Sequence, residues 1–274
     1  MNLLRPGLLG LLLVSSLISL NAQQFGGIFQ PTDAELDYTT SVGWEALVAE
    51  QQQQSTNGFR MIDLESVRST NGGERTFYAI FTESSLQDSV GTFLGWPEFV
   101  KAKRQMYSAG WMIVDVHGYA LNESDTQYIG VWVKDDNPHK IARLSTREGL
   151  DNRIRAMGRQ RFKLKRVHVI NSPSGEPEFI ALFHYSPVYE YNFVYYSDDA
   201  EDFRREYQER YQSNTRLIDF ASFFDEGKTW QLGIFQAADY DVDFRRSSTK
   251  SELDSTTMAL NNESGLSLLN LNIW

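Results

Sequence analysis

The chain carries four short hydrophobic runs that share one pattern, in which a small residue stands between larger apolar residues. The runs are Tyr78-Ala79-Ile80-Phe81, Ile129-Gly130-Val131-Trp132, Ile180-Ala181-Leu182-Phe183 and Leu232-Gly233-Ile234-Phe235. Their small residues lie at 79, 130, 181 and 233, so the spacings are 51, 51 and 52 residues. A period this regular predicts a tandem array of one supersecondary unit.

A second strand-like run precedes each of these runs, at residues 59–64, 111–116, 162–167 and 215–220. The loops between the paired runs are rich in residues that favour turns, so each pair predicts a β-hairpin. The residues immediately before these runs, and before a last strand-like run at 266–271, are Gly58, Gly110, Arg161, Asn214 and Gly265. Glycine and asparagine adopt the left-handed conformation that ends a helix. Four of the five positions therefore suit a helix that runs directly into a strand.

A helix is predicted before each hairpin and before the last run. The helix starts are marked by glutamates at 45, 98, 148, 201 and 252, with spacings of 53, 50, 53 and 51 residues. Ser145, Asp198 and Thr249 each lie three residues before one of these glutamates, which is a helix-capping pattern. A further extended stretch precedes each helix, at 35–40, 92–94, 140–144, 191–196 and 241–245. The repeating unit is therefore three strands and a helix.

These elements predict an α+β fold of tandem β-β-β-α repeats, each of about 51 residues. We expect four full copies with partial units at both ends. They are predicted to form one curved antiparallel sheet or half-barrel, with the helices on one side. The tail at 265–271 follows the fifth predicted helix. It is expected either to cap the array or to pair with an N-terminal strand and close it.

The first residues predict an export signal. Arg5 is followed by an apolar stretch from Leu8 to Leu20, and Ala22 comes next to the expected cleavage point, as in a secretory signal peptide. We expect residues 1–22 to be the signal peptide, residues 23–34 a linker and residues 35–274 the tandem-repeat domain. The chain has no cysteine and no other apolar run of membrane-spanning length. It is therefore predicted to be secreted or periplasmic, with no membrane span.

The charge of the chain limits its expected partners. Lysine and arginine number 26 against 36 aspartates and glutamates, so the formal net charge is −10. A negative protein repels phosphate backbones and anionic lipid surfaces, which argues against nucleic acid and acidic membranes as partners. The expected binding partner is therefore a protein, a peptide or a glycan. The sequence does not predict the oligomeric state.

The order of these patterns resembles a known repeat. Its best copy is residues 110–133, where a glycine precedes a strand that contains an aspartate, followed by a loop and the small-residue run. This is similar to the bacterial tandem repeats, about 50 residues long, that are related to the N-terminal half of fungal polyglycine hydrolases. The resemblance covers about residues 35–271 and weakens in the third unit, where Arg166 replaces the aspartate.

In those hydrolases catalysis belongs to a separate serine β-lactamase-like domain, which is not found in this sequence. The resemblance therefore implies the repeat fold and an accessory or recognition role, and it implies no reaction. Ser247-Ser248-Thr249-Lys250 matches the Ser-x-x-Lys nucleophile signature of such enzymes. Because this tetrad falls at a predicted helix start, a helix cap is the better interpretation.

Two rows of ionisable residues follow the repeat. His117 and His168 are 51 residues apart and hold the same strand position in adjacent units, and Glu65 and Ala221 complete that row. Strand alternation places a second row on the same face, two residues earlier in each copy. Its members are Asp63, Asp115, Arg166 and Asp219.

Three interpretations of these rows are open. In the first, Glu65, Asp115, His117, Arg166 and His168 form a strip that contacts a ligand. Alternatively, Arg166 neutralises Asp115 and Asp219 while the imidazoles hydrogen-bond locally, since periodic polar residues usually serve the repeat itself. A transition-metal site from His117, His168 and Glu65 is the third. Nothing in the sequence fixes their convergence, so no metal or cofactor is assigned.

A tyrosine-rich segment at 185–196 is a second candidate surface, with Tyr189 and Tyr191 as proposed ligand contacts. No recognisable nucleophile, base and orienting group recur together, so no catalytic residue is predicted. The sequence favours a secreted non-catalytic repeat module that binds a polymer, peptide or protein partner. The alternative is a hydrolase or hydrolase-accessory protein with an unrecognised active site.

Overall fold

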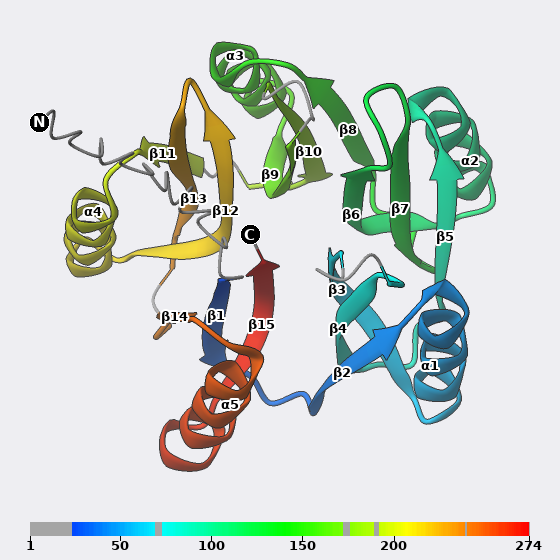
Figure 1. Ribbon diagram of the computed structural model, residues 1–274, viewed down its shortest axis with the longest axis horizontal. Coiled ribbons are helices and arrows are strands. Elements are labelled where there is room, and N and C mark those ends of the chain that lie inside the picture. The colour runs from blue at the N-terminus through cyan, green and yellow to red at the C-terminus, as the bar shows by residue number, and fades with distance from the viewer. Residues whose placement is uncertain (1–23, 69–72, 172–175, 189–191, 239, 274) are drawn as a thin grey trace, which may run out of the picture.

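The computed structural model describes residues 24–68, 73–171, 176–188, 192–238 and 240–273. These residues form an α+β fold with 15 strands in five antiparallel sheets of three strands each, together with five helices (Figure 1). The predicted α+β class and the repeated strand-and-helix units are confirmed. No helix in these ranges is long and apolar enough to cross a membrane.

Four of the sheets come from continuous segments in the order strand, helix, strand, strand. The first comprises β2 (Leu36–Val42), α1 (Trp44–Thr56), β3 (Phe59–Val67) and β4 (Thr76–Glu83). The next three are β5 (Asp88–Leu94), α2 (Trp96–Ser108), β6 (Met112–Ala120) and β7 (Thr126–Val133); β8 (His139–Leu144), α3 (Arg147–Gly158), β9 (Phe162–Asn171) and β10 (Pro177–Tyr185); and β11 (Asn192–Ser197), α4 (Ala200–Gln212), β12 (Thr215–Asp225) and β13 (Lys228–Ala237). In each sheet the last strand is central and pairs antiparallel with the other two.

The fifth sheet joins the two ends of the chain. β14 (Asp243–Ser247), α5 (Lys250–Ser264) and β15 (Leu266–Ile273) come from the C-terminal end. Their central strand is β1 (Phe25–Pro31), which pairs with both β14 and β15. The prediction that residues 23–34 form a linker is wrong, because β1 supplies the backbone hydrogen bonds that both C-terminal strands need. The tail does pair with an N-terminal strand, and that strand is β1.

The predicted single curved sheet or half-barrel is also wrong. No strand ladder joins one sheet to the next within the described ranges, so the strands form five separate sheets and no closed barrel. The phase of the repeat differs too. The strand before each helix pairs with the hairpin after that helix, as β2 does with β4. With this pairing the partial units expected at the two ends of the array do not occur, because their strands belong to complete three-stranded sheets.

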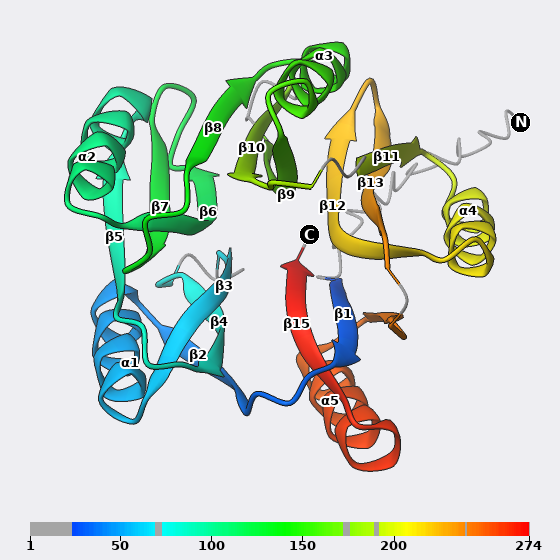
Figure 2. The ribbon, with the colours of Figure 1, turned by 180° about the vertical axis from the view of Figure 1, so that it is seen from behind.

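The five sheets surround a central axis, with β3, β6, β9, β12 and β15 nearest to it (Figure 1; Figure 2). Each of these inner strands contacts the inner strands of both neighbouring sheets, and the contact between β15 and β3 completes the ring. The helices, expected on one side of a single sheet, lie on the outer rim of this ring.

The central strands are hydrophobic on both faces, and this holds neighbouring sheets together. In β4, Ala79 packs in one core cluster with Ile129 of the second sheet. Ile80, on the opposite face, packs in another cluster with Phe29 of the fifth sheet. Similar clusters fill the other gaps between neighbouring sheets. An unbroken apolar run is the pattern of a strand that is buried on both faces.

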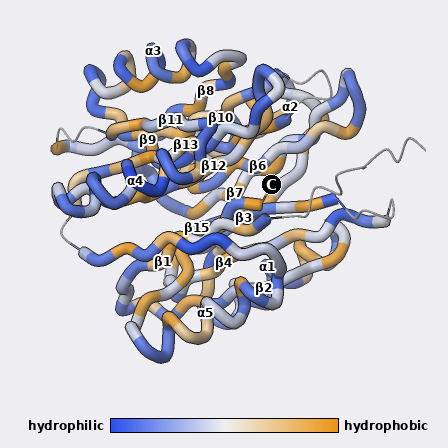
Figure 3. The backbone as a smooth tube through the Cα atoms, turned by 60° about the vertical axis from the view of Figure 1, so that its left-hand side comes forward, coloured by the Kyte–Doolittle hydropathy of each residue, from blue (hydrophilic) through white to orange (hydrophobic). Residues whose placement is uncertain are grey.

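The helices turn a narrow face inward. α4 is mostly hydrophilic in Figure 3 and contributes Phe203 as its buried residue. Its N-cap is Asp199 and that of α3 is Thr146, each one residue later than predicted, whereas Thr249 caps α5 as predicted. A residue with positive φ stands one residue before four of the inner strands, including Arg161 at 63°, and two residues before β6, where it is Gly110. A helix therefore runs directly into a strand in every unit.

Gly130 tests the close packing on β7. A methyl group added at Gly130 would come within 2.2 Å of Cη2 of Trp132, whose ring packs against Phe99 of α2. We expect Gly130→Ala to lower the free energy of unfolding by about 2 kcal/mol or more through overpacking. Gly158→Ala is the control, because outside its chain neighbours and its own helix backbone no atom lies within 4 Å of the added methyl group. Equal urea midpoints for the two variants would contradict this packing.

Candidate functional site

Bulges in the inner strands place one row of polar side chains on the central axis. The register of β3, β6 and β12 against their central strands shifts immediately before Asp63, Asp115 and Asp219. The same shift occurs before Arg166 in β9 and before Asn270 in β15. The extra residue at a bulge re-aims the side chains around it. We call these five residues the axial ring.

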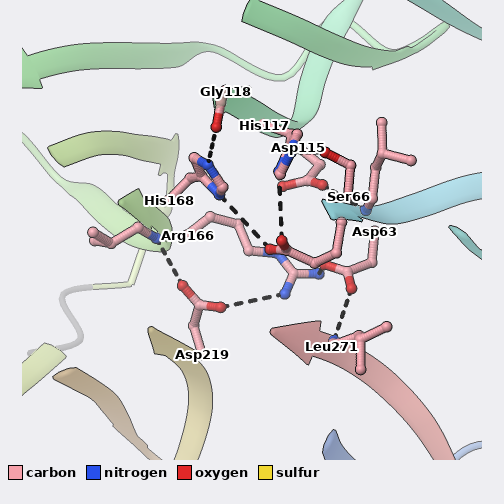
Figure 4. Close-up of polar contacts among 12 residues, drawn as sticks. Asp63, Ser66, Asp115, His117, Gly118, Arg166, His168, Asp219 and Leu271 are labelled. Carbon is pink, nitrogen blue, oxygen red and sulfur yellow. Dashed lines mark hydrogen bonds and ion pairs between the residues drawn. The ribbon is translucent and has the colours of Figure 1, made fainter. Parts of the chain in front are cut away.

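The carboxylates of the axial ring join neighbouring sheets. Each accepts a hydrogen bond from the backbone amide that follows the ring residue of an adjacent inner strand. These pairs are Asp63 Oδ2 with Leu271 N at 2.8 Å, Asp115 Oδ2 with Leu64 N at 2.8 Å, and Asp219 Oδ2 with Val167 N at 2.7 Å (Figure 4). A buried carboxylate that accepts amide hydrogen bonds fixes the position of both strands.

The Arg166 guanidinium contacts two of these carboxylates. Its Nη2 lies 3.2 Å from Oδ1 of Asp63, and its Nη1 lies 3.5 Å from Oδ1 of Asp219. Burial raises the pKa of Asp63 well above its usual range and that of Asp219 to about 7, and Arg166 opposes both rises. Although burial lowers it, these carboxylates hold the pKa of Arg166 above its ordinary value. Arg166 therefore stays cationic, and its ion-pair partners are Asp63 and Asp219 instead of the expected Asp115 and Asp219.

Glu65, His117 and His168 converge two residues further along the inner strands, and we call them the axial triad. Nδ1 of His117 lies 3.5 Å from Oε2 of Glu65, and Nδ1 of His168 lies 3.7 Å from Oε1. The two imidazole centroids are 4.3 Å apart. Burial raises the pKa of Glu65 and lowers that of His117 well below its usual range. Burial also acts to lower the pKa of His168, but the adjacent Glu65 raises it.

Further contacts orient both imidazoles. Nε2 of His168 donates to the carbonyl oxygen of Gly118 at 2.8 Å, and Nε2 of His117 lies 2.6 Å from Oγ of Ser66 (Figure 4). Ser66 Oγ also accepts a hydrogen bond from Nη1 of Arg75 at 3.1 Å. The Nδ1 atoms are thereby directed at the Glu65 carboxylate. This arrangement can share protons, or hold a cation between its three ligand atoms.

A cavity of about 340 Å³ lies beside the axial ring, and we call it the axial cavity. Its apolar lining includes the bulge residues of four inner strands, which are Ile62, Val114, Ile218 and Leu269. Lys165 holds the bulge position of the remaining inner strand, β9, and also lines the cavity. Burial lowers the pKa of Lys165, and Arg166 lowers it further. Lys165 has no ion-pair partner among the residues that the structure describes.

The structure brings together the five residues of the predicted strip. Glu65, Asp115, His117, Arg166 and His168 meet at the axis from β3, β6 and β9, where they are largely buried and not spread along an exposed face. Tyr189 and Tyr191 lie outside the described residues.

Two residues of the site escaped the sequence analysis. Lys165 could have been found from the sequence, because it is a lysine at a repeat position that is aliphatic in the other units, as Ile62, Val114 and Ile218. Ser66 could not have been found in this way. Its partner His117 belongs to another sheet, and their contact depends on how the sheets are arranged.

No protein-family model matches this chain, and no curated protein matches it. The resemblance to the repeat units of polyglycine hydrolases therefore stays a prediction. The function has to be argued from the axial ring, the axial triad and the axial cavity.

Arg166→Met tests the charge balance of the axial ring. Without the guanidinium, the carboxyl groups of Asp63 and Asp219 stay buried and lose their cation. We expect this to lower the free energy of unfolding by about 3 kcal/mol. Arg204→Met breaks an exposed pair with Glu201 on α4 and should leave stability nearly unchanged, so it is the control. Urea denaturation of both variants measures the difference, and equal losses would show that the axial ring does not depend on its cation.

Proposed function

We propose that this chain is a secreted, non-catalytic repeat module that binds a peptide or protein partner, which inserts an anionic group into the axial cavity. The observation that carries the proposal is Lys165, a cation that lines the axial cavity and has no ion-pair partner in the described part of the chain. Export rests on the signal-like pattern of residues 1–22, which lie outside that part.

The repeat makes Lys165 exceptional. The other four inner strands fill this position with aliphatic residues, so the framework needs no cation there. Arg166 is already held by Asp63 and Asp219. Lys165 is therefore the group left to pair with an anion from outside, and charge-assisted hydrogen bonds are among the strongest polar contacts.

The cavity suits a peptide group. A volume of about 340 Å³ lies at the small end of the range for ligand sites, which suits a side chain or a chain end. Aspartate, glutamate or a terminal carboxylate can reach Lys165 while neighbouring apolar atoms contact Ile62 and Ile218. The wall also carries amide, imidazole and phenol groups, among them Gln30, His184 and Tyr240, which can hydrogen-bond the peptide backbone next to such a carboxylate. The resemblance to a recognition domain points the same way.

Lys165→Met tests this proposal. A peptide array probed with the full chain selects carboxylate-bearing ligands, and calorimetry gives their Kd. We expect Lys165→Met to weaken binding about tenfold or more, because it removes the charge and keeps the length of the side chain. Lys101→Met, at an exposed position of α2, is the matched control and should bind as the parent does. Selection of glycans or neutral peptides alone, or an unchanged Kd for Lys165→Met, would contradict the proposal.

A hydrolase is the second candidate function, because Ser66, His117 and Glu65 are ordered like a Ser-His-acid triad. Oγ of Ser66 lies 2.6 Å from Nε2 of His117, whose Nδ1 faces Glu65 at 3.5 Å. The burial and hydrogen bonding of Ser66 and His117 argue against hydrolysis. Ser66 is 8% exposed and His117 is 2% exposed, and Arg75 donates to the hydroxyl oxygen that would have to attack. A nucleophile must be reachable by its substrate.

A fluorophosphonate probe separates the two candidates, because it reacts with activated serines. We expect no labelling of the folded chain by intact mass spectrometry. Labelling that is lost in Ser66→Ala, but kept in Ser124→Ala at an exposed turn between β6 and β7, would replace the binding proposal with hydrolysis.

A further inference from the structure

We propose that the axial triad, Glu65, His117 and His168, binds one divalent transition-metal ion, with Zn²⁺ as the ion of best-matching chemistry. The triad offers one carboxylate oxygen and two imidazole nitrogens, and these atoms lie within 4.8 Å of one another. They come from three neighbouring inner strands, β3, β6 and β9. The site does not involve Lys165, so it stands apart from the proposed binding function.

The distances inside the axial triad suit ligands of one ion better than a hydrogen-bonded cluster. The separations of 3.5 and 3.7 Å between Nδ1 and carboxylate oxygen exceed the range of about 2.7 to 3.2 Å for N–H···O hydrogen bonds. Two ligand atoms that each lie about 2.0 to 2.1 Å from a tetrahedral Zn²⁺ are about 3.4 Å apart. The carboxylate therefore faces both imidazoles at nearly the separation that a shared ion imposes.

The outer nitrogen of each imidazole is already engaged, which leaves the inner one for a metal. Nε2 of His168 donates to the Gly118 carbonyl, and Nε2 of His117 contacts Ser66. Such contacts orient metal-binding histidines. Nδ1 of His117 is buried and has no hydrogen-bond partner in the part of the chain that the structure describes. A buried polar atom without a partner is costly, and a metal bond would relieve that cost.

The charge near the axis also favours a cation. Four carboxyl groups are buried there, from Glu65, Asp63, Asp115 and Asp219. Arg166, which pairs with two of them, contributes one permanent positive charge. A divalent ion at the axial triad would place positive charge next to the Glu65 carboxylate and near the other three carboxyl groups.

The donor set narrows the class of metal. The chain has no cysteine, so the site offers nitrogen and oxygen ligands, which suit Zn²⁺ or Fe²⁺, while two imidazoles disfavour Ca²⁺ and Mg²⁺. Asn272 holds the equivalent position on β15, the inner strand beside β3. Its buried Oδ1 has no hydrogen-bond partner within the described ranges. This oxygen, or a water molecule, can complete four-coordination.

Zinc binding by the full chain tests the proposal. The chain is stripped with EDTA, freed of the chelator and titrated with ZnCl₂ by calorimetry, and the bound zinc is counted by elemental mass spectrometry. We expect about one ion per chain and a Tm that rises with zinc concentration. Glu65→Gln and His168→Gln should each weaken binding about 100-fold or more, because each removes a ligand.

His184→Gln is the matched control. Nε2 of His184 also donates to a strand carbonyl, that of Ile113 at 2.8 Å, but His184 lies outside the axial triad. The His184→Gln variant should bind zinc with the same affinity as the parent chain. X-ray absorption of the zinc-loaded parent should show two imidazole ligands, a readout that needs no variant to fold. Absence of bound zinc at saturating ZnCl₂, a zinc ion without imidazole ligands, or an equal loss in His184→Gln would overturn the proposal.

Discussion

The hydrophobic central strands constrain the whole molecule. In β4, Ala79 belongs to the core shared with the second sheet and Ile80 to the core shared with the fifth. One open sheet covered by helices on a single side would leave half of these side chains in water. A ring gives every sheet two neighbours. It can close because β1 completes the fifth sheet from the opposite end of the chain.

Closing the ring creates a crowded axis, where polar groups lose water and must find partners. Asp63, Asp115 and Asp219 meet this requirement by accepting amide hydrogen bonds across the gaps between sheets. An unbroken row of aspartates would collect five like charges in a dry space. Arg166 and Asn270 interrupt the row. One supplies the opposite charge, and the other replaces a carboxylate by a neutral amide that donates to Asp219 at 2.8 Å.

Local signals in the sequence predicted the elements better than the way they join. The repeat period, the hairpin loops and the residues suited to positive φ located most strands and helices, because each depends on neighbouring residues. Strand pairing depends on distant residues. β1 has two glycines and a proline, which strands disfavour, and its partners lie at the other end of the chain. The axial triad was visible as a repeat spacing, but its burial was not, since it follows from ring closure.

Two departures from the repeat stand side by side in β9. Lys165 faces the axial cavity and Arg166 faces the carboxylates of the axial ring, while His168 of the same strand faces the Glu65 carboxylate of the axial triad. A residue that follows the repeat is constrained by equivalent partners in two neighbouring sheets, so an exception is tolerated where it gains a partner that the repeat does not provide. The order along the strand sets the chemistry of the axis. Along β9, Lys165 of the proposed anion site precedes Arg166, and His168 of the proposed metal site follows it. A single strand therefore supplies a cation for a negative group and an imidazole ligand for a positive ion.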